Sequence, residues 1–394
     1  MKKIRVVHLI PTLMPGGAER MAVHIVRGLN GQRFEVALIS VSRRVGSDLE
    51  CLLAESGAKV WYLGKDLGFD YRTYCRLHRV LRDYRPDIIH THLQVLRYAL
   101  PSMLWLKGTS MLLHTVNNVA EREVEPRARW IQRYAFNHGV IPIAVAEEVA
   151  QSLKRLYGIQ RCRVISNCIP TAYYTSPQTS RREWRAREGF TNDDVLFVCV
   201  ARLAPQKNHA LLLKAFAQGP ASDSKAHLVL VGDGSLREQL QQQANNLGLA
   251  GRVHFLGLRT DIPDVLGAMD VFVLGSDYEG SPLSVVEAMA SGLPILSTAS
   301  GGVPELFDSG KEGFIVRPGD VKGLSGLMVS LLKDPEARRS MGMAAARRAR
   351  ENLDVSVMIR EYEKLYESLL DHLDSQKEHA VRESVLPTDE GVRV

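Results

Sequence analysis

Two glutamates eight positions apart have the residue type and spacing best suited to binding chemistry in this chain. Glu279 lies on a predicted loop, and Glu287 lies in the second turn of a predicted helix, roughly 8–10 Å further along the axis. Pro282 suits the first helical position, with Ser281 before it as N-cap. The start of such a helix offers free N–H groups and a positive dipole end, which together favour a phosphate.

The two carboxylates indicate what accompanies that phosphate. A carboxylate beside an anion site repels the anion unless the carboxylate binds something uncharged. Ionised carboxylates only accept hydrogen bonds, and paired sugar hydroxyls suit them well. A diphosphate with hydroxyl-rich groups on both sides is a nucleotide sugar. Two glutamates at this spacing also occur by chance on solvated helices, so the spacing alone leaves a surface role open.

The surrounding elements are those of an open α/β sheet. Val271 to Leu274 is a short apolar run that predicts a buried parallel strand, and strand, loop and helix in this order form ligand crevices at the carboxyl edge of such sheets. The whole chain alternates in this way. Strands are expected at 4–10, 34–41, 59–63, 87–91, 111–115, 140–146 and 163–166, and then at 195–201, 227–231, 253–256, 271–274, 294–298 and 313–316.

The sequence around the two glutamates resembles a known family. Residues 279–283 read Glu-Gly-Ser-Pro-Leu, and residues 287–294 read Glu-Ala-Met-Ala-Ser-Gly-Leu-Pro. They closely resemble the donor-binding motif of the retaining GT-B glycosyltransferases of family four. Weaker similarities lie at 16–20 (Gly-Gly-Ala-Glu-Arg), 201–208 (Ala-Arg-Leu-Ala-Pro-Gln-Lys-Asn), 257–263 and 301–305. The resemblance implies a GT-B architecture, with two Rossmann-like, doubly wound parallel-sheet domains facing a central cleft.

This architecture assigns a role to each part of the chain. We expect an N-terminal acceptor-side domain at 1–170, a linker at 171–192 and a C-terminal nucleotide-sugar-binding domain at 193–353. A helix at 354–374 should pack back on the first domain, and the polar tail at 375–394 should be disordered. The hinge at 165–170 departs from the family pattern, because Cys168 replaces a glycine and Pro170 replaces an aspartate.

Four residues, His114, Arg202, Lys207 and Glu279, are the candidates for catalysis, and Glu287 is a candidate for donor binding. Arg202 offers a planar fork and Lys207 a point charge, and both follow a predicted buried strand, where they would neutralise a diphosphate. The resemblance implies that Glu279 holds sugar hydroxyls and that Glu287 holds the ribose. It also implies that His114, at the end of its strand, lies near the transferred sugar. A hydrogen-bonded histidine at the strand end is the structural alternative for His114.

Glycines and a helix start make up the rest of the donor site. Gly16 and Gly17 precede a predicted helix, where adjacent glycines form a simple turn or allow a phosphate to approach the backbone. The dinucleotide fingerprint Gly-x-Gly-x-x-Gly is absent at this turn, which argues against an NAD enzyme. The remaining candidates for donor binding are Gly232, Arg259, Gly280, Ser281, Leu283, Ser284 and Glu287.

The sequence predicts neither a metal nor another cofactor. His90 and His92 point the same way along a predicted strand, but no third ligand follows at a suitable spacing, so we expect them to line the cleft or to bond to backbone. An Asp-x-Asp motif is also absent. Protein cations are therefore expected to replace a divalent ion at the diphosphate.

Composition excludes several classes of protein. The five cysteines are scattered and odd in number, which favours a reducing cytosol over a disulfide scaffold. The longest apolar region, 99–113, is interrupted by Pro101 and Lys107 and is not expected to span a bilayer. The net charge of +6 gathers at 72–85 and 122–133. These are solvated helix faces or a surface for an anionic membrane or a lipid-phosphate acceptor, whereas no nucleic-acid-binding signature accompanies the charge.

Together these features predict a retaining glycosyltransferase. Its donor would be a nucleotide sugar such as a UDP- or GDP-sugar, and its acceptor a glycan or a lipid-linked acceptor in bacterial polysaccharide or glycolipid synthesis. The protein would be cytoplasmic, at the inner face of the membrane where it contacts anionic lipid. Two alternatives stay open, namely a nucleotide-sugar epimerase of the same architecture and a non-catalytic nucleotide-sugar-binding protein.

Overall fold

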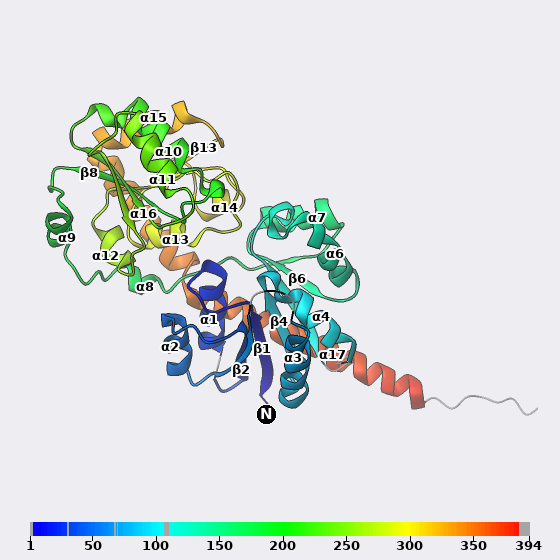
Figure 1. Cartoon of the computed structure of the whole chain (residues 1–394). Coiled ribbons are helices and arrows are strands. Elements are labelled where there is room, and N and C mark those ends of the chain that lie inside the picture. Colours follow the sequence, from blue (N-terminus) through cyan, green and yellow to red (C-terminus); the bar gives the residue numbers. More distant parts are fainter. Residues whose placement is uncertain (1–2, 30, 67, 69, 106–109, 386–394) are drawn as a thin grey trace, which may run out of the picture.

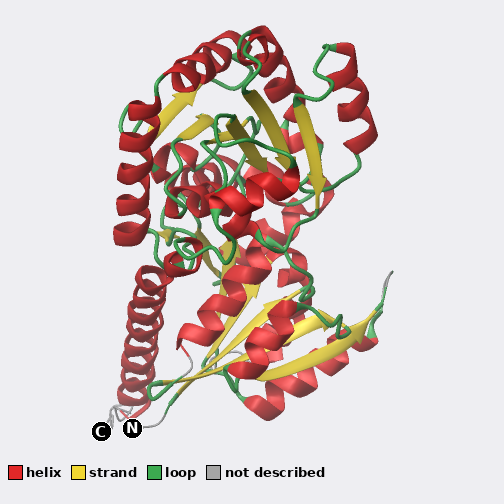
Figure 2. Cartoon of the chain, turned by 90° about the vertical axis from the view of Figure 1, so that its left-hand side faces the viewer, coloured by secondary structure: helices red, strands yellow, loops and turns green. Residues whose placement is uncertain are grey.

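The chain folds around two parallel β-sheets, one in each half of the sequence (Figure 1). The structure is a computed structural model, and it describes residues 3–29, 31–66, 68, 70–105 and 110–385. Strands of both sheets are flanked by helices (Figure 2). The predicted fold class, two Rossmann-like α/β domains, is confirmed.

The first sheet has seven strands in the order β3-β2-β1-β4-β5-β6-β7. Alternate residues of each strand face opposite sides, so the sheet has two hydrophobic layers. One layer packs against α1, α2 and α17, and the other packs against α3, α4, α6 and α7. The strands are β1 (Ile4–Ile10), β2 (Phe34–Ser42), β3 (Lys59–Lys65), β4 (Ile88–His92), β5 (Met111–Val116), β6 (Ile141–Ala144) and β7 (Arg163–Val164).

The helices of this half connect the parallel strands. They are α1 (Gly17–Leu29), α2 (Asp48–Glu55), α3 (Arg72–Tyr84), η1 (Leu93–Val95), α4 (Leu96–Trp105), α5 (Ala120–Glu123), η2 (Pro126–Ala128), α6 (Arg129–Asn137) and α7 (Glu147–Tyr157).

The second sheet has six strands in the order β10-β9-β8-β11-β12-β13, built around a single large hydrophobic core. Its strands are β8 (Val195–Val200), β9 (Ala226–Val231), β10 (Val253–Gly257), β11 (Val271–Leu274), β12 (Ile295–Thr298) and β13 (Gly313–Val316). Its helices are α8 (Thr171–Tyr174), α9 (Arg181–Glu188), η3 (Pro205–Lys207), α10 (His209–Gln218), η4 (Pro220–Ser222), α11 (Arg237–Asn246), α12 (Ile262–Gly267), α13 (Leu283–Ala290), α14 (Val303–Leu306), α15 (Val321–Lys333) and α16 (Pro335–Asn352).

The strand orders place a topological switch point in each sheet. The order reverses between β1 and β4 in the first sheet and between β8 and β11 in the second. Ligands of open α/β sheets bind in the crevice outside the carboxyl ends of the strands at such a point. The loops after β8 and β11 carry Lys207 and Glu279, so the second switch point coincides with the predicted donor site.

The chain crosses between the two halves twice, and the crossings are hydrogen-bonded to each other. Ile169 N–H donates to Leu353 O (3.1 Å), and Val355 N–H donates to Ile169 O (2.8 Å). The Asp354 carboxylate accepts from the Thr171 hydroxyl at 2.6 Å. Asp354 therefore supplies a carboxylate at the hinge, where the sequence has no aspartate at 170. Cys168 is buried and is not among the described residues with positive φ, so the hinge does not need a glycine there.

Helix α17 (Val355–Val385) returns to the first domain and packs on α1 (Figure 1). The predicted helix at 354–374 is therefore present, but it continues to Val385, which contradicts the predicted disorder of residues 375–385. Residues 386–394 of the predicted tail lie outside the described residues. No helix in the described part of the chain is both long and apolar enough to cross a bilayer.

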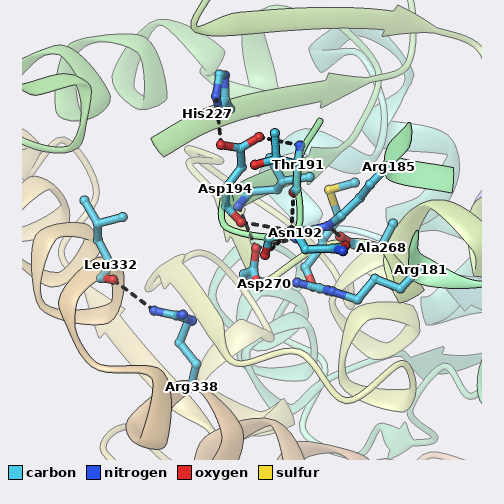
Figure 3. A network of polar contacts seen from close by, with 12 residues as sticks. Arg181, Arg185, Thr191, Asn192, Asp194, His227, Ala268, Asp270, Leu332 and Arg338 are labelled. Carbon is cyan, nitrogen blue, oxygen red and sulfur yellow. Dashed lines mark hydrogen bonds and ion pairs between the residues drawn. The ribbon is translucent and has the colours of Figure 1, made fainter. Parts of the chain in front are cut away.

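A buried arginine fixes α9 to the second sheet (Figure 3). The Arg185 side chain is fully buried and forms an ion pair with Asp270 at 2.7 Å. Its guanidinium also donates to the carbonyls of Ala268 (2.8 Å) and Asp194 (2.9 Å). Arg181 contacts the other oxygen of Asp270 at 2.5 Å. A buried charge is tolerated only when it is paired and hydrogen-bonded, and these contacts satisfy the Arg185 guanidinium and hold α9 on the second sheet.

Candidate active site

The loops after β8 and β11 are hydrogen-bonded to each other at the switch point. Asp277 N–H donates to Gln206 O (2.9 Å), and Gln206 Nε2 donates to Tyr278 O (2.8 Å). Asn208 Nδ2 donates to Asp277 Oδ1 (2.8 Å), and Asn208 Oδ1 also caps α10. None of these positioning residues was predicted from the sequence. An asparagine directly before an apolar helix was the available signal for Asn208.

Lys207 and Glu279 meet at the centre of these loops. Lys207 Nζ lies 2.6 Å from Glu279 Oε1, and Ser276 Oγ donates to the same oxygen at 2.6 Å. Glu279 is 4% exposed. Arg202 follows the same strand as Lys207, but its side chain is exposed and has no polar partner among the described residues. The structure thus brings Lys207 and Glu279 together and leaves Arg202 at the solvent side.

Glu287 is also buried, and its partners come from elsewhere in the chain. Tyr174 from α8 donates its hydroxyl to Glu287 Oε1 at 2.8 Å, and Arg20 from α1 lies 3.1 Å from the same oxygen. Burial raises the pKa of Glu287, and Arg20 and Tyr174 oppose this shift. Arg20 belongs to the Gly-Gly-Ala-Glu-Arg segment, so two motifs 267 residues apart are in contact.

The helix start between the two glutamates differs from the prediction. Helix α13 begins at Leu283, and Pro282 occupies the N-cap position, so the prediction of Ser281 as N-cap was wrong. Ser281 Oγ is buried and lacks a partner among the described residues. Because the first N–H groups of a helix have no intrahelical acceptor, those of Leu283 and Ser284 are available to a ligand.

Two glycines of the site, Gly280 and Gly232, lie where neighbouring backbone leaves no room for a Cβ. A Cβ on Gly280 would lie 1.9 Å from Asn117 O, across the cleft in the first domain. A Cβ on Gly17 would lie 3.5 Å from the Leu283 side chain of the second domain, which is an ordinary van der Waals contact. Gly232 has a φ of 129°, and a Cβ there would lie 2.2 Å from Ala201 O. The chain's own backbone therefore occupies the space beside Gly232.

Gly16 and Arg259 form hydrogen bonds with other residues of the protein. Gly16 O accepts from Arg20 N–H at the start of α1 (3.0 Å). The Arg259 guanidinium donates two hydrogen bonds to Asp261 (2.6 and 2.8 Å) and one to Glu188 (3.1 Å). These ion pairs raise the pKa of Arg259, against its burial. Two carboxylates thus already engage the guanidinium that we had assigned to the donor.

His114 is fully buried at the end of β5. The Thr91 hydroxyl donates to Leu113 O (2.9 Å) and lies 2.9 Å from His114 Nδ1. Since that hydroxyl has one hydrogen, His114 Nδ1 carries the proton, and Nε2 is a bare acceptor. Nε2 has no partner among the described residues. Burial lowers the pKa of His114 to about 4, so the ring is neutral at pH 7.

A third histidine joins His90 and His92, which the sequence analysis did not anticipate. His8 comes from β1, and one nitrogen of each ring lies within 4.8 Å of the others. His8 Nδ1 lies 2.9 Å from His92 Nε2, His90 Nδ1 lies 2.6 Å from Tyr366 Oη, and His90 Nε2 lies 2.7 Å from Thr115 Oγ1. The expectation that these histidines line the cleft or bond to backbone was wrong. They are buried between the sheet and α17 and bond to side chains.

The two domains touch across the cleft at three further places. Asn167 Nδ2 donates to Ser281 O at 3.2 Å. The Arg122 guanidinium lies over the Tyr278 ring, 5.1 Å from its centroid. The Leu283 side chain packs against the cores of both domains. The domains are therefore closed on each other at the loop that carries Glu279.

Glu305 of the second domain accepts two hydrogen bonds from the first domain. Its two carboxylate oxygens accept the backbone N–H groups of Glu147 (2.7 Å) and Glu148 (2.9 Å), at the start of α7 in the first domain. A carboxylate is the favoured partner of a helix N-terminus. The sequence analysis gave the segment at 301–305 no such role, because the partner lies in the other domain.

Comparisons with known proteins show the family to which the chain belongs. Residues 180–348 match glycosyl transferases group 1, and residues 15–173 match glycosyltransferase family 4. N-acetyl-alpha-D-glucosaminyl L-malate synthase of Bacillus anthracis is 31% identical over 312 residues, which cover 77% of this chain and 80% of the relative. The chain belongs to this glycosyltransferase family. The family assignment does not favour the epimerase and binding-protein alternatives.

Other members support the same assignment. A UDP-Gal:alpha-D-GlcNAc-diphosphoundecaprenol alpha-1,3-galactosyltransferase of Escherichia coli is 27% identical over 361 residues, which cover 84% of this chain and 89% of that glycosyltransferase. The structure of Anabaena HepE with UDP and glucose superposes with a TM-score of 0.81 at 21% identity, over 93% of this chain and all of HepE. At this identity the superposition shows a shared fold.

Proposed function

We propose that this glycosyltransferase retains the anomeric configuration of its substrate and moves a sugar from a nucleoside diphosphate to a glycan or a lipid-linked acceptor. The observation that carries the proposal is the contact between Lys207 and Glu279 beside the start of α13. The pair sets a cation against a carboxylate at 2.6 Å. The bond between a sugar and a diphosphate needs these two partners side by side, a cation for phosphate oxygens and a carboxylate for sugar hydroxyls.

The diphosphate would be held by fixed donors. We expect Lys207, Arg202 and the N–H groups of Leu283 and Ser284 to bind the diphosphate, and Gly17 to contribute from the other domain, where it lies next to the Leu283 side chain. Negative charge develops on the diphosphate as the sugar leaves, and preorganised donors aimed at developing charge supply a large part of enzymatic rate enhancement. These cations would act in place of a divalent ion, so the reaction should continue in the presence of a chelator.

The sugar and the ribose would lie on opposite sides of the diphosphate. Glu279 would hold hydroxyls of the transferred sugar, and His114 Nε2 would accept a hydrogen bond from another. Glu287 would hold the ribose through Oε2, because both of its protein contacts end on Oε1. The closed domains would exclude water from the reacting bond and so limit hydrolysis. As in the family it resembles, the acceptor would attack on the face of the departing phosphate.

Incubation with a panel of UDP- and GDP-sugars, followed by measurement of released nucleoside diphosphate, tests the proposal. One arm contains a lipid-linked acceptor and the other lacks it, each with and without EDTA. Acceptor-dependent release that is insensitive to EDTA supports the proposal, and the anomeric configuration of the product follows from its NMR coupling constants. Release that requires a divalent ion, or a product of inverted configuration, contradicts it.

We also propose that the protein works in the cytoplasm at an anionic membrane surface. Helix α6 presents Trp130 (68% exposed) and Tyr134 (46% exposed) one turn apart, next to the exposed side chains of Arg127 and Arg133. Aromatic side chains favour the interfacial layer of a bilayer, and basic side chains are attracted to anionic lipid. The relative from E. coli, whose name includes a diphosphoundecaprenol acceptor, gives further support.

Sedimentation with liposomes at low salt tests this second proposal. The protein should sediment with vesicles rich in anionic lipid and stay in solution with neutral ones, and Trp130→Ala should reduce the bound fraction. Equal recovery with both kinds of vesicle contradicts it.

A further inference from the structure

The acceptor-side domain contains a cavity of about 160 Å³ between two segments that follow adjacent strands. One segment, 93–97, begins directly after β4, and the other, 124–132, follows the loop after β5. Both lie beyond the carboxyl ends of their strands, on the edge of the sheet where α/β proteins bind ligands. Glu123, next to the cavity wall, accepts the N–H of Asn117 at 3.2 Å, and the carbonyl of Asn117 abuts Gly280. The cavity is thus one loop away from the proposed donor site.

The size of the cavity limits what it can hold. An engineered cavity of roughly 150 Å³ in another protein accommodates one benzene molecule, so this cavity has room for a single six-membered ring. Its walls are partly apolar, which suits the C–H face of such a ring. The apolar lining residues are Leu93, Leu96, Val124, Ala128 and Ile131.

One buried polar group in the wall lacks a partner. Gln132 is 3% exposed, and the Tyr157 hydroxyl donates to its Oε1 at 2.8 Å. Its Nε2 atom is buried without a hydrogen-bond partner among the described residues. An unpaired buried donor costs about 1–3 kcal/mol, and a ligand oxygen in the cavity would remove that cost.

The charges around the cavity balance each other. Arg97 and Glu125 are the charged residues of the lining, and Gln94 and Gln132 are its amides. An anionic ligand would gain from Arg97 but would be repelled by Glu125. A neutral ligand with several hydroxyls fits both, because hydroxyls accept from Arg97 and Gln132 and donate to Glu125.

A strained residue lies in the wall of the cavity. Leu93 has a φ of 56°, which is costly for a bulky side chain. The two other non-glycine residues with positive φ in the described ranges are Arg85 and Asn208, and both are helix caps. Leu93 has no such local explanation. Backbone strain of this kind is concentrated at ligand sites, where the surrounding structure holds it in place.

We propose that this cavity is the acceptor subsite and that it takes one neutral pyranose ring, the sugar that receives the transferred unit. The ring packs its C–H face on the apolar walls, and its hydroxyls bond to Gln132 Nε2, Arg97 and Glu125. This inference rests on the proposed function, and it narrows the acceptor from any glycan or lipid to one that ends in an uncharged sugar.

Direct binding of small probes tests the subsite without any donor. Methyl α-D-glucopyranoside, its galacto- and manno- isomers and the N-acetylglucosamine glycoside serve as neutral probes, and L-malate serves as the anionic probe, all monitored by ligand-observed NMR. At least one pyranoside should bind more tightly than malate. Ala128→Trp, which fills the cavity from a half-exposed position, should weaken that binding at least about tenfold.

A matched pair of variants separates this role from a structural one. Gln132→Met removes both the Nε2 donor and the bond to Tyr157, and it should weaken the pyranoside about five- to tenfold, whereas Tyr157→Phe removes only the bond and should leave binding unchanged. Binding of UDP and GDP is measured on every variant. This control distinguishes a failure of the acceptor subsite from a failure of the donor site, on which the proposed function depends. Tighter binding of malate than of every pyranoside, or equal pyranoside binding by wild type and Ala128→Trp, overturns the subsite.

Discussion

Replacement of Gly280 by alanine should prevent the domains from closing without changing either domain. The new Cβ would lie 1.9 Å from Asn117 O and 3.1 Å from Val145 Cγ2, and both atoms belong to the opposite domain. A carbon and a carbonyl oxygen approach to about 3.3 Å, so the two loops must separate by roughly 1.4 Å. Misplacement of reacting groups by about 1 Å costs on the order of 100-fold in rate. We therefore expect kcat to fall about 100-fold.

Steady-state kinetics with the best nucleotide sugar, together with calorimetric titration of the nucleoside diphosphate, measures this effect. The nucleotide affinity should stay within about twofold, because the clash lies on the side of the first domain. Gly326→Ala is the matched control, since a Cβ at Gly326 in α15 meets nothing within 4 Å. It should leave kcat unchanged. A Gly280→Ala enzyme with the kcat of wild type would refute the reasoning that this closed contact is the catalytic arrangement.

Two further predictions concern the cleft and the buried histidines. Glu305→Ala removes the acceptor for two N–H groups at the start of α7. It should therefore lower kcat about fivefold and increase the radius of gyration measured by small-angle scattering. Glu305→Gln keeps one acceptor oxygen and should have a smaller effect on both quantities. Unchanged kinetics and scattering would show that the contact does not hold the domains. Burial lowers the pKa of His8 to about 3, so the folded state stays unprotonated while the unfolded state takes up a proton below pH 6.5. Stability should therefore fall as the pH drops from 7.5 to 5, by about 2 kcal/mol for this group. Urea unfolding at both pH values measures the drop in the free energy of unfolding. His8→Asn should reduce this drop by about 2 kcal/mol, and the exposed control His138→Asn should leave it unchanged. An equal drop in the two variants would contradict the claim that His8 is unprotonated in the folded state.

The fold followed closely from hydrophobic patterning. The strands β1, β11 and β13 begin and end where they were predicted, because each is a short, mainly apolar run between polar, proline or glycine residues. The limits of β6 and β7 were set too wide, since apolar residues continue past the end of the hydrogen-bonded ladder. Helix α17 was cut short at 374, because a polar sequence near the terminus was taken as evidence of disorder.

The sequence predicted the geometry of the site correctly where the residues that meet come from neighbouring strands of one domain. Glu279, Lys207 and the start of α13 could be placed together, because loops at the carboxyl ends of adjacent parallel strands share one crevice. The partners of Glu287 could not, since Arg20 comes from the other domain. His8 was missed as a neighbour of His90 for a related reason, because their contact depends on the pairing of β1 with β4, which brings together residues 82 positions apart. The contact of Glu305 with α7 likewise depends on how two domains meet, which no pattern within one segment encodes.

The most direct test of the account is nucleotide binding and turnover by Lys207→Ala, alone and combined with Arg202→Ala. The account predicts that the double variant loses affinity for the nucleoside diphosphate and loses turnover by at least about 100-fold, because two protein cations stand in for a metal at the diphosphate. Glu279→Gln should keep nucleoside diphosphate affinity while losing turnover of the nucleotide sugar. Wild-type turnover in the double variant would contradict the central claim that Lys207 and Arg202 hold the diphosphate beside Glu279.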